Sequence, residues 1–242
     1  MSPGMPSRSN HNSPRVIITI DGPAGTGKST VAHQLAKHLG LEFLDTGAMY
    51  RAAALVALDD KIDPTDGLTL ASAVERIELH FEWSADPPRL LLGDRDVSRR
   101  IRELDVSEVV SIVAGQRELR RLLVARQRRI AQAHPRLVSE GRDQGSVVFP
   151  EADLRFYLDA DIAIRAQRRA RQLVDAGMQV SQDRIERDIR QRDRMDESRA
   201  DGPLVRPEGA IVVDTGDRSV EQVVTELAQI AHRQLLDFGL DP

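Results

Sequence analysis

The sequence predicts an α/β fold of three layers, in which a parallel β-sheet carries helices on both faces. Two observations support this prediction. Short apolar runs alternate along the chain with longer helical segments, and strands that alternate with helices pair in parallel. The length of 242 residues also suits one α/β domain with a sizeable insert.

The expected elements follow in chain order. Residues 16–20 (VIITI) form a β-branched apolar run that is typical of a buried strand, and a glycine-rich turn follows. Further strands are expected at 41–45, 137–140, 154–158 and 210–214. Helices are expected at 30–39, 48–58, 162–176, 182–199 and 220–236, with two more inside 104–130 that meet near Gly115.

Residues 61–104 interrupt this alternation. The segments 79–83 and 89–92 flank Asp86-Pro87-Pro88, a pattern that predicts an antiparallel hairpin. We therefore expect a small subdomain inserted into the main domain, which extends over 15–236.

Composition excludes several kinds of protein. The net charge of −4 does not favour a polyanion binder, and the lack of cysteine excludes disulfides and thiolate zinc sites. No apolar run approaches the length of a membrane span. Residues 1–14 are polar and rich in Ser, Pro and Asn, which predicts a disordered leader. A cytoplasmic location is the default expectation.

Residues 22–29 (GPAGTGKS) fit the phosphate-binding pattern G-x-x-x-x-G-K-[ST], with a strand expected before it and a helix after it. Such a loop points backbone N–H groups at the phosphates, and the helix adds its positive N-terminal end. Lys28 is expected to reach the β- and γ-phosphates, and the Ser29 hydroxyl to hold Mg²⁺. The fold is therefore predicted to be a P-loop NTPase. The expected triphosphate-binding residues are Gly22, Pro23, Ala24, Gly25, Thr26, Gly27, Lys28, Ser29 and Thr30.

Three classes of NTP-using protein compete at this point. A guanine-reading switch usually carries N-K-x-D, but the only asparagines are Asn10 and Asn12, both in the leader. A nucleic-acid machine favours aromatic stacking platforms, and aromatic residues make up only 3% of the chain. A kinase needs a second phosphate site for its acceptor, and arginine suits that task.

Arginines follow the expected strands in the required places. Arg51 falls in the first turns of a helix after the second strand, within LDTGAMYR. Arg142 and Asp143 follow the strand at 137–140, and ligands of open α/β sheets bind at that end of the strands. These positions predict an acceptor phosphate site.

The two helices within 161–200 are a candidate lid. The second is very polar, with an apolar stripe of essentially Ile185 and Ile189, as expected of a mobile element. Its Arg192, Asp196 and Arg199 share one face, and either a site or a solvated ion pair explains them. The first helix leaves the same choice between exposed charges and lid arginines that cover the phosphates for Arg165, Arg168 and Arg169.

Over residues 16 to about 230 the chain resembles the bacterial cytidylate kinase family. The resemblance rests on IDGPAGTGKST, LDTGAMYR, GDRDVSRRIR, EGRDQGSVVFP, RRARQL, RDRMDESR and VVDTGDRSVEQVV. It implies a parallel-sheet core, an inserted nucleotide-binding subdomain at 61–104 and an arginine-bearing lid at 161–200. One departure is Gln144, where the family more often has Met or another apolar residue.

The resemblance also implies roles for individual residues. Arg51, Arg142 and Arg192 are expected at the CMP phosphate, and Ser111, Arg120 and Asp143 at cytosine or its sugar. The implied CMP-binding set is Thr46, Tyr50, Arg51, Ser111, Arg120, Arg142, Asp143, Arg192, Asp196 and Arg199. The implied catalytic residues are Lys28, Arg142, Arg192 and Arg168.

The implied activity is ATP-dependent, Mg²⁺-dependent phosphorylation of CMP and dCMP in pyrimidine nucleotide metabolism, by a monomer without nucleic-acid or membrane partners. The acceptor phosphate is already mostly anionic at neutral pH, so the reaction requires no general base, and none is obvious in the sequence. Two alternatives stay open: a UMP/CMP or other small-acceptor kinase, and an ATP-binding regulatory protein.

Overall fold

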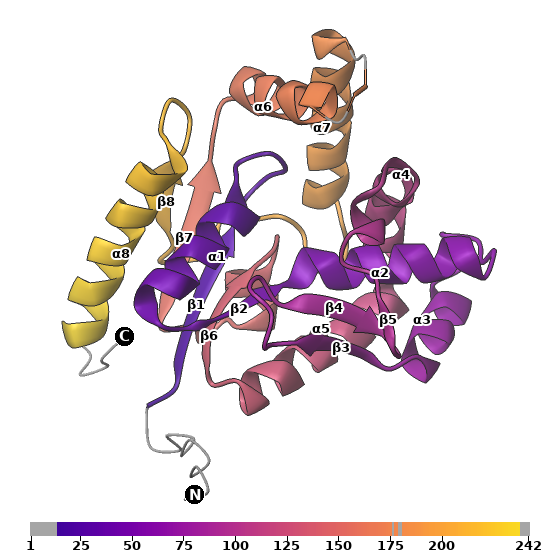
Figure 1. Ribbon diagram of the computed structural model, residues 1–242, viewed down its shortest axis with the longest axis horizontal. Helices are drawn as coiled ribbons and strands as arrows, with labels where there is room; N and C mark the ends of the chain where they lie inside the picture. The colour runs from indigo at the N-terminus through magenta and orange to yellow at the C-terminus, as the bar shows by residue number, and fades with distance from the viewer. Residues whose placement is uncertain (1–13, 176, 179–180, 238–242) are drawn as a thin grey trace, which may run out of the picture.

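The computed structural model describes residues 14–175, 177–178 and 181–237, so nearly all of the expected leader lies outside the described residues. Its main sheet has five parallel strands in the spatial order β2-β6-β1-β7-β8 (Figure 1). These strands are β1 (Val16–Asp21), β2 (Glu42–Asp45), β6 (Arg136–Glu140), β7 (Leu154–Asp159) and β8 (Ile211–Asp214).

Helices cover both faces of this sheet, which confirms the predicted fold class. One face packs against α1 (Lys28–Leu39) and α8 (Val220–Asp237). The other face packs against α2 (Thr46–Asp59), α4 (Leu104–Val113) and α5 (Arg117–Ala133). Alternation along β1 divides its side chains between the layers: Val16, Ile18 and Ile20 join the first cluster, and Ile17 joins the second.

A side-chain cap explains why α2 begins two residues earlier than predicted. Asp45 ends β2, and its Oδ1 accepts the backbone N–H of Ala48 over 2.8 Å. This contact satisfies one of the free N–H groups of the first turn. The strand therefore passes directly into the helix that carries Tyr50 and Arg51.

The segment 61–104 contains the predicted hairpin, in which β3 (Leu79–Glu82) pairs antiparallel with β4 (Arg89–Leu92). A short strand β5 (Arg95–Asp96) extends this sheet. A helix that was not predicted, α3 (Gly67–Arg76), precedes it and buries apolar residues at helical spacing against the main core. The indole of Trp83 stacks on His134 at 4.0 Å between ring centroids, which ties the hairpin to the end of α5.

Two further helices, α6 (Ile162–Asp175) and α7 (Gln182–Glu197), stand together at one end of the molecule, beyond the carboxyl end of β7 (Figure 1). Among the described residues, their buried apolar cluster consists of Ala166, Ile185 and Ile189, with Ile162, Ala170 and Leu173 of α6 partly buried against it. The predicted thin apolar stripe of α7 is therefore confirmed. None of the described helices combines the length and apolarity needed to cross a bilayer.

Candidate active site

The phosphate loop leads from the carboxyl end of β1 into α1. Its first glycine, Gly22, has φ +145°, and a Cβ there would lie 2.1 Å from the carbonyl oxygen of Leu158. Only glycine fits this position. The connection between β8 and α8 supports the loop, because the Thr215 hydroxyl donates to the carbonyl of Thr26 over 3.0 Å.

Lys28 is buried beneath this loop. Its Nζ donates to the carbonyl oxygen of Pro23 over 2.6 Å. Burial, together with the nearby charge of Arg142, lowers the pKa of Lys28, although Glu140 opposes this shift. A bound polyphosphate would stabilise the charged ammonium and reverse the shift.

Ser29 lies beside a carboxylate that the sequence analysis did not select. The Ser29 hydroxyl donates to Oε1 of Glu140 over 2.7 Å, and Glu140 ends the strand next to β1. Burial, and then repulsion from Asp45, raises the pKa of Glu140. A hydroxyl and a carboxylate side by side are hard oxygen donors of the kind that Mg²⁺ prefers. The signal that was available is the position of Glu140 as the first residue of EGRD, at the end of a predicted strand.

A small cavity of about 60 Å³ lies next to this pair. It is closed by the start of α2, by α4, α5 and α7, and by the turn after β6. All of the predicted CMP-binding residues line it: Thr46, Tyr50, Arg51, Ser111, Arg120, Arg142, Asp143, Arg192, Asp196 and Arg199. The structure therefore gathers the whole predicted acceptor set, together with Gly47, Val110, Ala114 and Gly141, which the sequence analysis did not select.

One end of this cavity is strongly cationic. Burial, and then repulsion from Arg142, lowers the pKa of Arg192 to about 9, and burial lowers the pKa of Arg51 to about 10. Nε of Arg192 is buried without a hydrogen-bond partner among the described residues. The positive charge of Arg142 is compensated by a carboxylate, because its Nε donates to Oδ2 of Asp196 over 2.9 Å. An acceptor phosphate would supply the missing anion and relieve the repulsion between the arginines.

The other end of the cavity holds a buried ion pair between Nη2 of Arg120 and Oδ2 of Asp143. The Arg120 guanidinium also lies over the Tyr50 ring, 5.4 Å from its centroid. Burial raises the pKa of Asp143 even though Arg120 and Arg199 oppose the shift. Gly202 covers the pair, since a Cβ there would lie 2.1 Å from Nη2 of Arg120. The sequence analysis missed Gly202, whose contact partners are far away along the chain.

The structure separates the three candidate lid arginines of α6. Arg165 reaches the phosphate loop, where its Nη1 donates to the carbonyl of Ala24 over 3.0 Å. Arg168 instead binds the connection that supports this loop, where it donates to the carbonyl oxygens of Thr215 and Gly216. Arg169 donates a hydrogen bond within its own helix, to Gln172, and its charge also acts on Arg51 and Arg192 of the cavity. The catalytic role expected of Arg168 stays a prediction.

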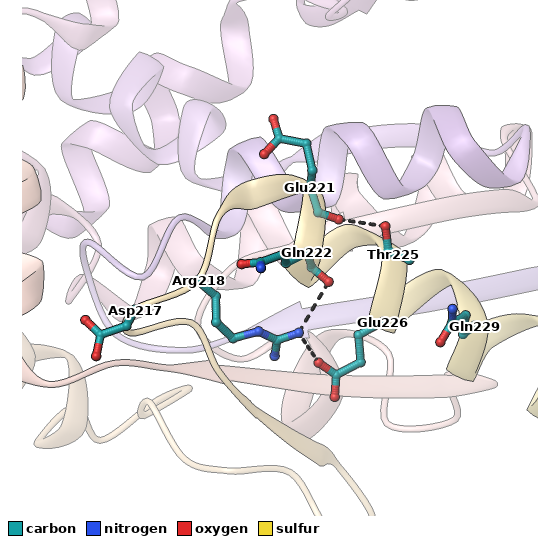
Figure 2. A pocket seen from close by; sticks show the side chains of 7 residues that line it. All are labelled: Asp217, Arg218, Glu221, Gln222, Thr225, Glu226 and Gln229. Atoms are coloured by element: carbon teal, nitrogen blue, oxygen red, sulfur yellow. Dashed lines mark hydrogen bonds and ion pairs between the residues drawn. The ribbon is translucent and has the colours of Figure 1, made fainter.

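A second hollow, of about 550 Å³, opens on the exposed face of α8 (Figure 2). Arg218 lies within it and pairs with Glu226 and with the carbonyl of Gln222 (Figure 2). None of the predicted site residues lines this hollow. The cavity beside the phosphate loop is therefore the candidate active site.

A parallel sheet whose first strand enters a phosphate loop, with an arginine-lined cavity beside that loop, defines a P-loop kinase of small molecules. Within this class the chain belongs to the cytidylate kinase family, whose model matches residues 18–233. The cytidylate kinase of Bordetella pertussis is 41% identical over 208 residues, which cover 86% of this chain and 91% of that protein. The cytidylate kinase of Caldanaerobacter subterraneus is 43% identical over 209 residues, with the same coverage.

A solved structure of an uncharacterized protein from Eubacterium ventriosum is similar with a TM-score of 0.52. The match covers 90% of this chain and 99% of that one at 12% identity, so it supports the fold alone.

Proposed function

We propose that this protein transfers the γ-phosphoryl group of ATP to CMP and dCMP, forming ADP and the nucleoside diphosphate. The observation that carries the proposal is the convergence of the acceptor residues on one cavity beside the phosphate loop. The two sites adjoin, because Glu140 holds Ser29 of the loop while the next two residues, Gly141 and Arg142, line the cavity.

The end of the cavity that holds the Arg120–Asp143 ion pair suits cytosine. The Asp143 carboxylate can accept a hydrogen bond from the exocyclic amino group of that base. Uracil presents a carbonyl oxygen at the same position, which would leave the buried carboxylate facing an oxygen lone pair. Arg120 and Ser111 can donate to the ring acceptors. The expected preference is therefore CMP and dCMP over UMP.

The chemical step needs little from the protein apart from positioning and charge. An oxygen of the CMP phosphate attacks the γ-phosphorus of ATP, and the bond from that phosphorus to the departing ADP oxygen breaks. The attacking phosphate carries no proton that must first be removed, because its second pKa is about 6. Lys28, Arg142 and Arg192 would offset the repulsion between two polyanions and hold them in line. Mg²⁺, held by Ser29 with Glu140 beside it, would neutralise further phosphate charge.

The cavity is far smaller than the roughly 300–1,000 Å³ of ordinary ligand pockets, so substrate entry requires the surrounding elements to separate. The helices within 161–200 are the proposed lid, and 61–104 the proposed acceptor-binding subdomain. Closure over both substrates would exclude water and limit wasteful hydrolysis of ATP. The cytoplasmic location, the monomeric state and the lack of nucleic-acid or membrane partners stay predictions.

The test is an ADP-release assay with ATP, Mg²⁺ and a panel of CMP, dCMP, UMP, AMP and GMP. We expect kcat/KM to be highest for CMP and dCMP, with little ADP formed when the acceptor is omitted. A preference for UMP or AMP would overturn the acceptor assignment and leave a P-loop kinase of another substrate. ATP binding without transfer to any acceptor would favour the regulatory alternative.

A further inference from the structure

Gln144 is a fully buried amide that lies behind the acceptor cavity and does not line it. It begins the π-helical turn Gln144–Val148 that follows β6. Its backbone N–H donates to Oδ1 of Asp21 over 2.8 Å, and the N–H of Gly145 donates to Oδ2 over the same distance. Asp21 therefore holds the backbone of Gln144 and Gly145 independently of the Gln144 side chain.

The side-chain amide of Gln144 contacts three polar partners. Its Oε1 accepts the hydroxyl of Ser139 over 2.8 Å. Its Nε2 lies 3.4 Å from Oε1 of Gln127 and 3.4 Å from Oδ1 of Asp143. An ionised carboxylate only accepts hydrogen bonds, so the NH₂ group must face Asp143, since the flipped amide would bring two oxygens together. The Ser139 hydroxyl matches this orientation.

Asp143 is consequently held on both of its oxygens. Arg120 binds Oδ2, and Gln144 approaches Oδ1 from inside the protein. Two donors on different oxygens oppose rotation of the carboxylate. A carboxylate without the second donor can turn away from an unfavourable neighbour.

We propose that Gln144 is a positioning residue that sets how strongly the enzyme prefers an acceptor base with an exocyclic amino group. The inference rests on the proposed function, because it concerns how the same cavity reads its acceptor. With Asp143 fixed, a uracil carbonyl meets a carboxylate oxygen that cannot move away. With Asp143 free on Oδ1, the mismatch is relieved and the discrimination weakens.

The direct test is Gln144→Met, which keeps the length of the side chain and removes its donor. A hydrogen bond to a charged group is worth about 1.5 kcal/mol at the weak end, which is roughly tenfold. We expect the ratio of kcat/KM for CMP to that for UMP to fall about tenfold, mainly through a lower KM for UMP, with kcat for CMP nearly unchanged. A variant in the background of Asp143→Asn should show less than about a twofold further change, since Gln144 acts through Asp143.

Thr19→Val is the matched control. Thr19 is equally buried on β1, and its hydroxyl lacks a hydrogen-bond partner among the described residues. We expect this variant to keep the wild-type acceptor ratio. Ser139→Ala removes the hydroxyl that holds Oε1 of the Gln144 amide, so it should also lower the ratio of kcat/KM for CMP to that for UMP. This variant tests the inference if Gln144→Met does not fold.

A folded Gln144→Met variant with the wild-type ratio of kcat/KM for CMP to that for UMP would overturn the inference. A further tenfold fall in this ratio when Gln144→Met is added to Asp143→Asn would overturn it as well. If Gln144→Met does not fold, an unchanged ratio in Ser139→Ala overturns it. Failure of the proposed function is a separate result, because the wild-type protein would then not phosphorylate CMP at all.

Discussion

Arg165 on α6 and Asp193 on α7 form a buried ion pair against the phosphate loop, with 2.6 Å between Nη1 and Oδ2. Both residues also bind the backbone of Ala24. Nη1 of Arg165 donates to the Ala24 carbonyl over 3.0 Å, and the backbone N–H of Ala24 donates to Oδ1 of Asp193 over 3.3 Å. Both helices therefore bind the phosphate loop at the same residue, Ala24, while the apolar cluster that they share is small.

We predict that Asp193→Ala lowers the free energy of unfolding by about 3 kcal/mol, because it leaves the Arg165 guanidinium buried without its counter-charge. The KM for ATP should rise in the same variant, since the loop loses an anchor. Glu186→Ala is the control on the same helix. It breaks a partly exposed pair with Arg190 and should cost less than about 1 kcal/mol. Equal losses in urea unfolding would show that the buried pair has no special role.

Lys28→Ala should nearly abolish transfer while the protein stays folded. The ammonium is expected at the β- and γ-phosphates, and removing one such electrostatic contact costs about 10²–10³ in kcat. Lys37→Ala, which removes an exposed lysine of the same helix, should leave kcat unchanged. A folded Lys28→Ala protein within about tenfold of the wild-type rate would contradict the assignment.

Arg142→Ala and Arg192→Ala should damage CMP use far more than ATP binding. Both side chains line the acceptor cavity, and no described residue accepts a hydrogen bond from Nε of Arg192. The measurements are kcat/KM for CMP and, by calorimetry, the Kd for ATP. Arg190→Ala is the exposed control on α7. Equal loss of both quantities would place the two arginines at the donor site.

Glu140→Gln should raise the Mg²⁺ concentration needed for half-maximal rate. The substitution keeps the shape of the side chain but removes the charge beside Ser29. The rate is measured against total Mg²⁺ at saturating ATP and CMP. If only the maximal rate falls and the Mg²⁺ midpoint stays in place, Glu140 does not help to hold the cation.

Asp21 should make the stability depend on pH. Burial raises the pKa of Asp21 to about 6, although the two backbone N–H groups that it accepts oppose the shift. A raised carboxyl pKa contributes stability that is present below about pH 4 and lost as the pH rises through 6. Unfolding of the wild type and of Asp21→Asn is compared between pH 4.5 and 7.5. Relative to the variant, the wild type should lose roughly 2 kcal/mol as the pH rises, and parallel pH profiles would contradict this.

Local pattern was enough to predict the alternating strands and helices, the phosphate loop and the hairpin. Each depends on neighbours in the sequence: the glycines of the loop, the apolar runs of the strands, and the prolines between the two hairpin strands. The resemblance to a family extended this to the predicted acceptor residues, which the structure gathers around one cavity; their role in binding CMP stays a prediction. The helix α3 was missed because it is short and lies inside a segment that was interpreted mainly from its hairpin.

The sequence by itself determined the fold class and the phosphate loop, and its family motifs predicted which residues would gather at one cavity, because those signals are local or are carried by contiguous motifs. Only the tertiary structure decided which partners these residues have. It placed Glu140 against Ser29 and gave Arg165 and Arg168 different partners. It also placed Gly202 over the Arg120–Asp143 ion pair and Gln144 behind Asp143. Most of these contacts join segments far apart in the chain, and the spacing of residues along one element carries no information about which distant atom it will meet.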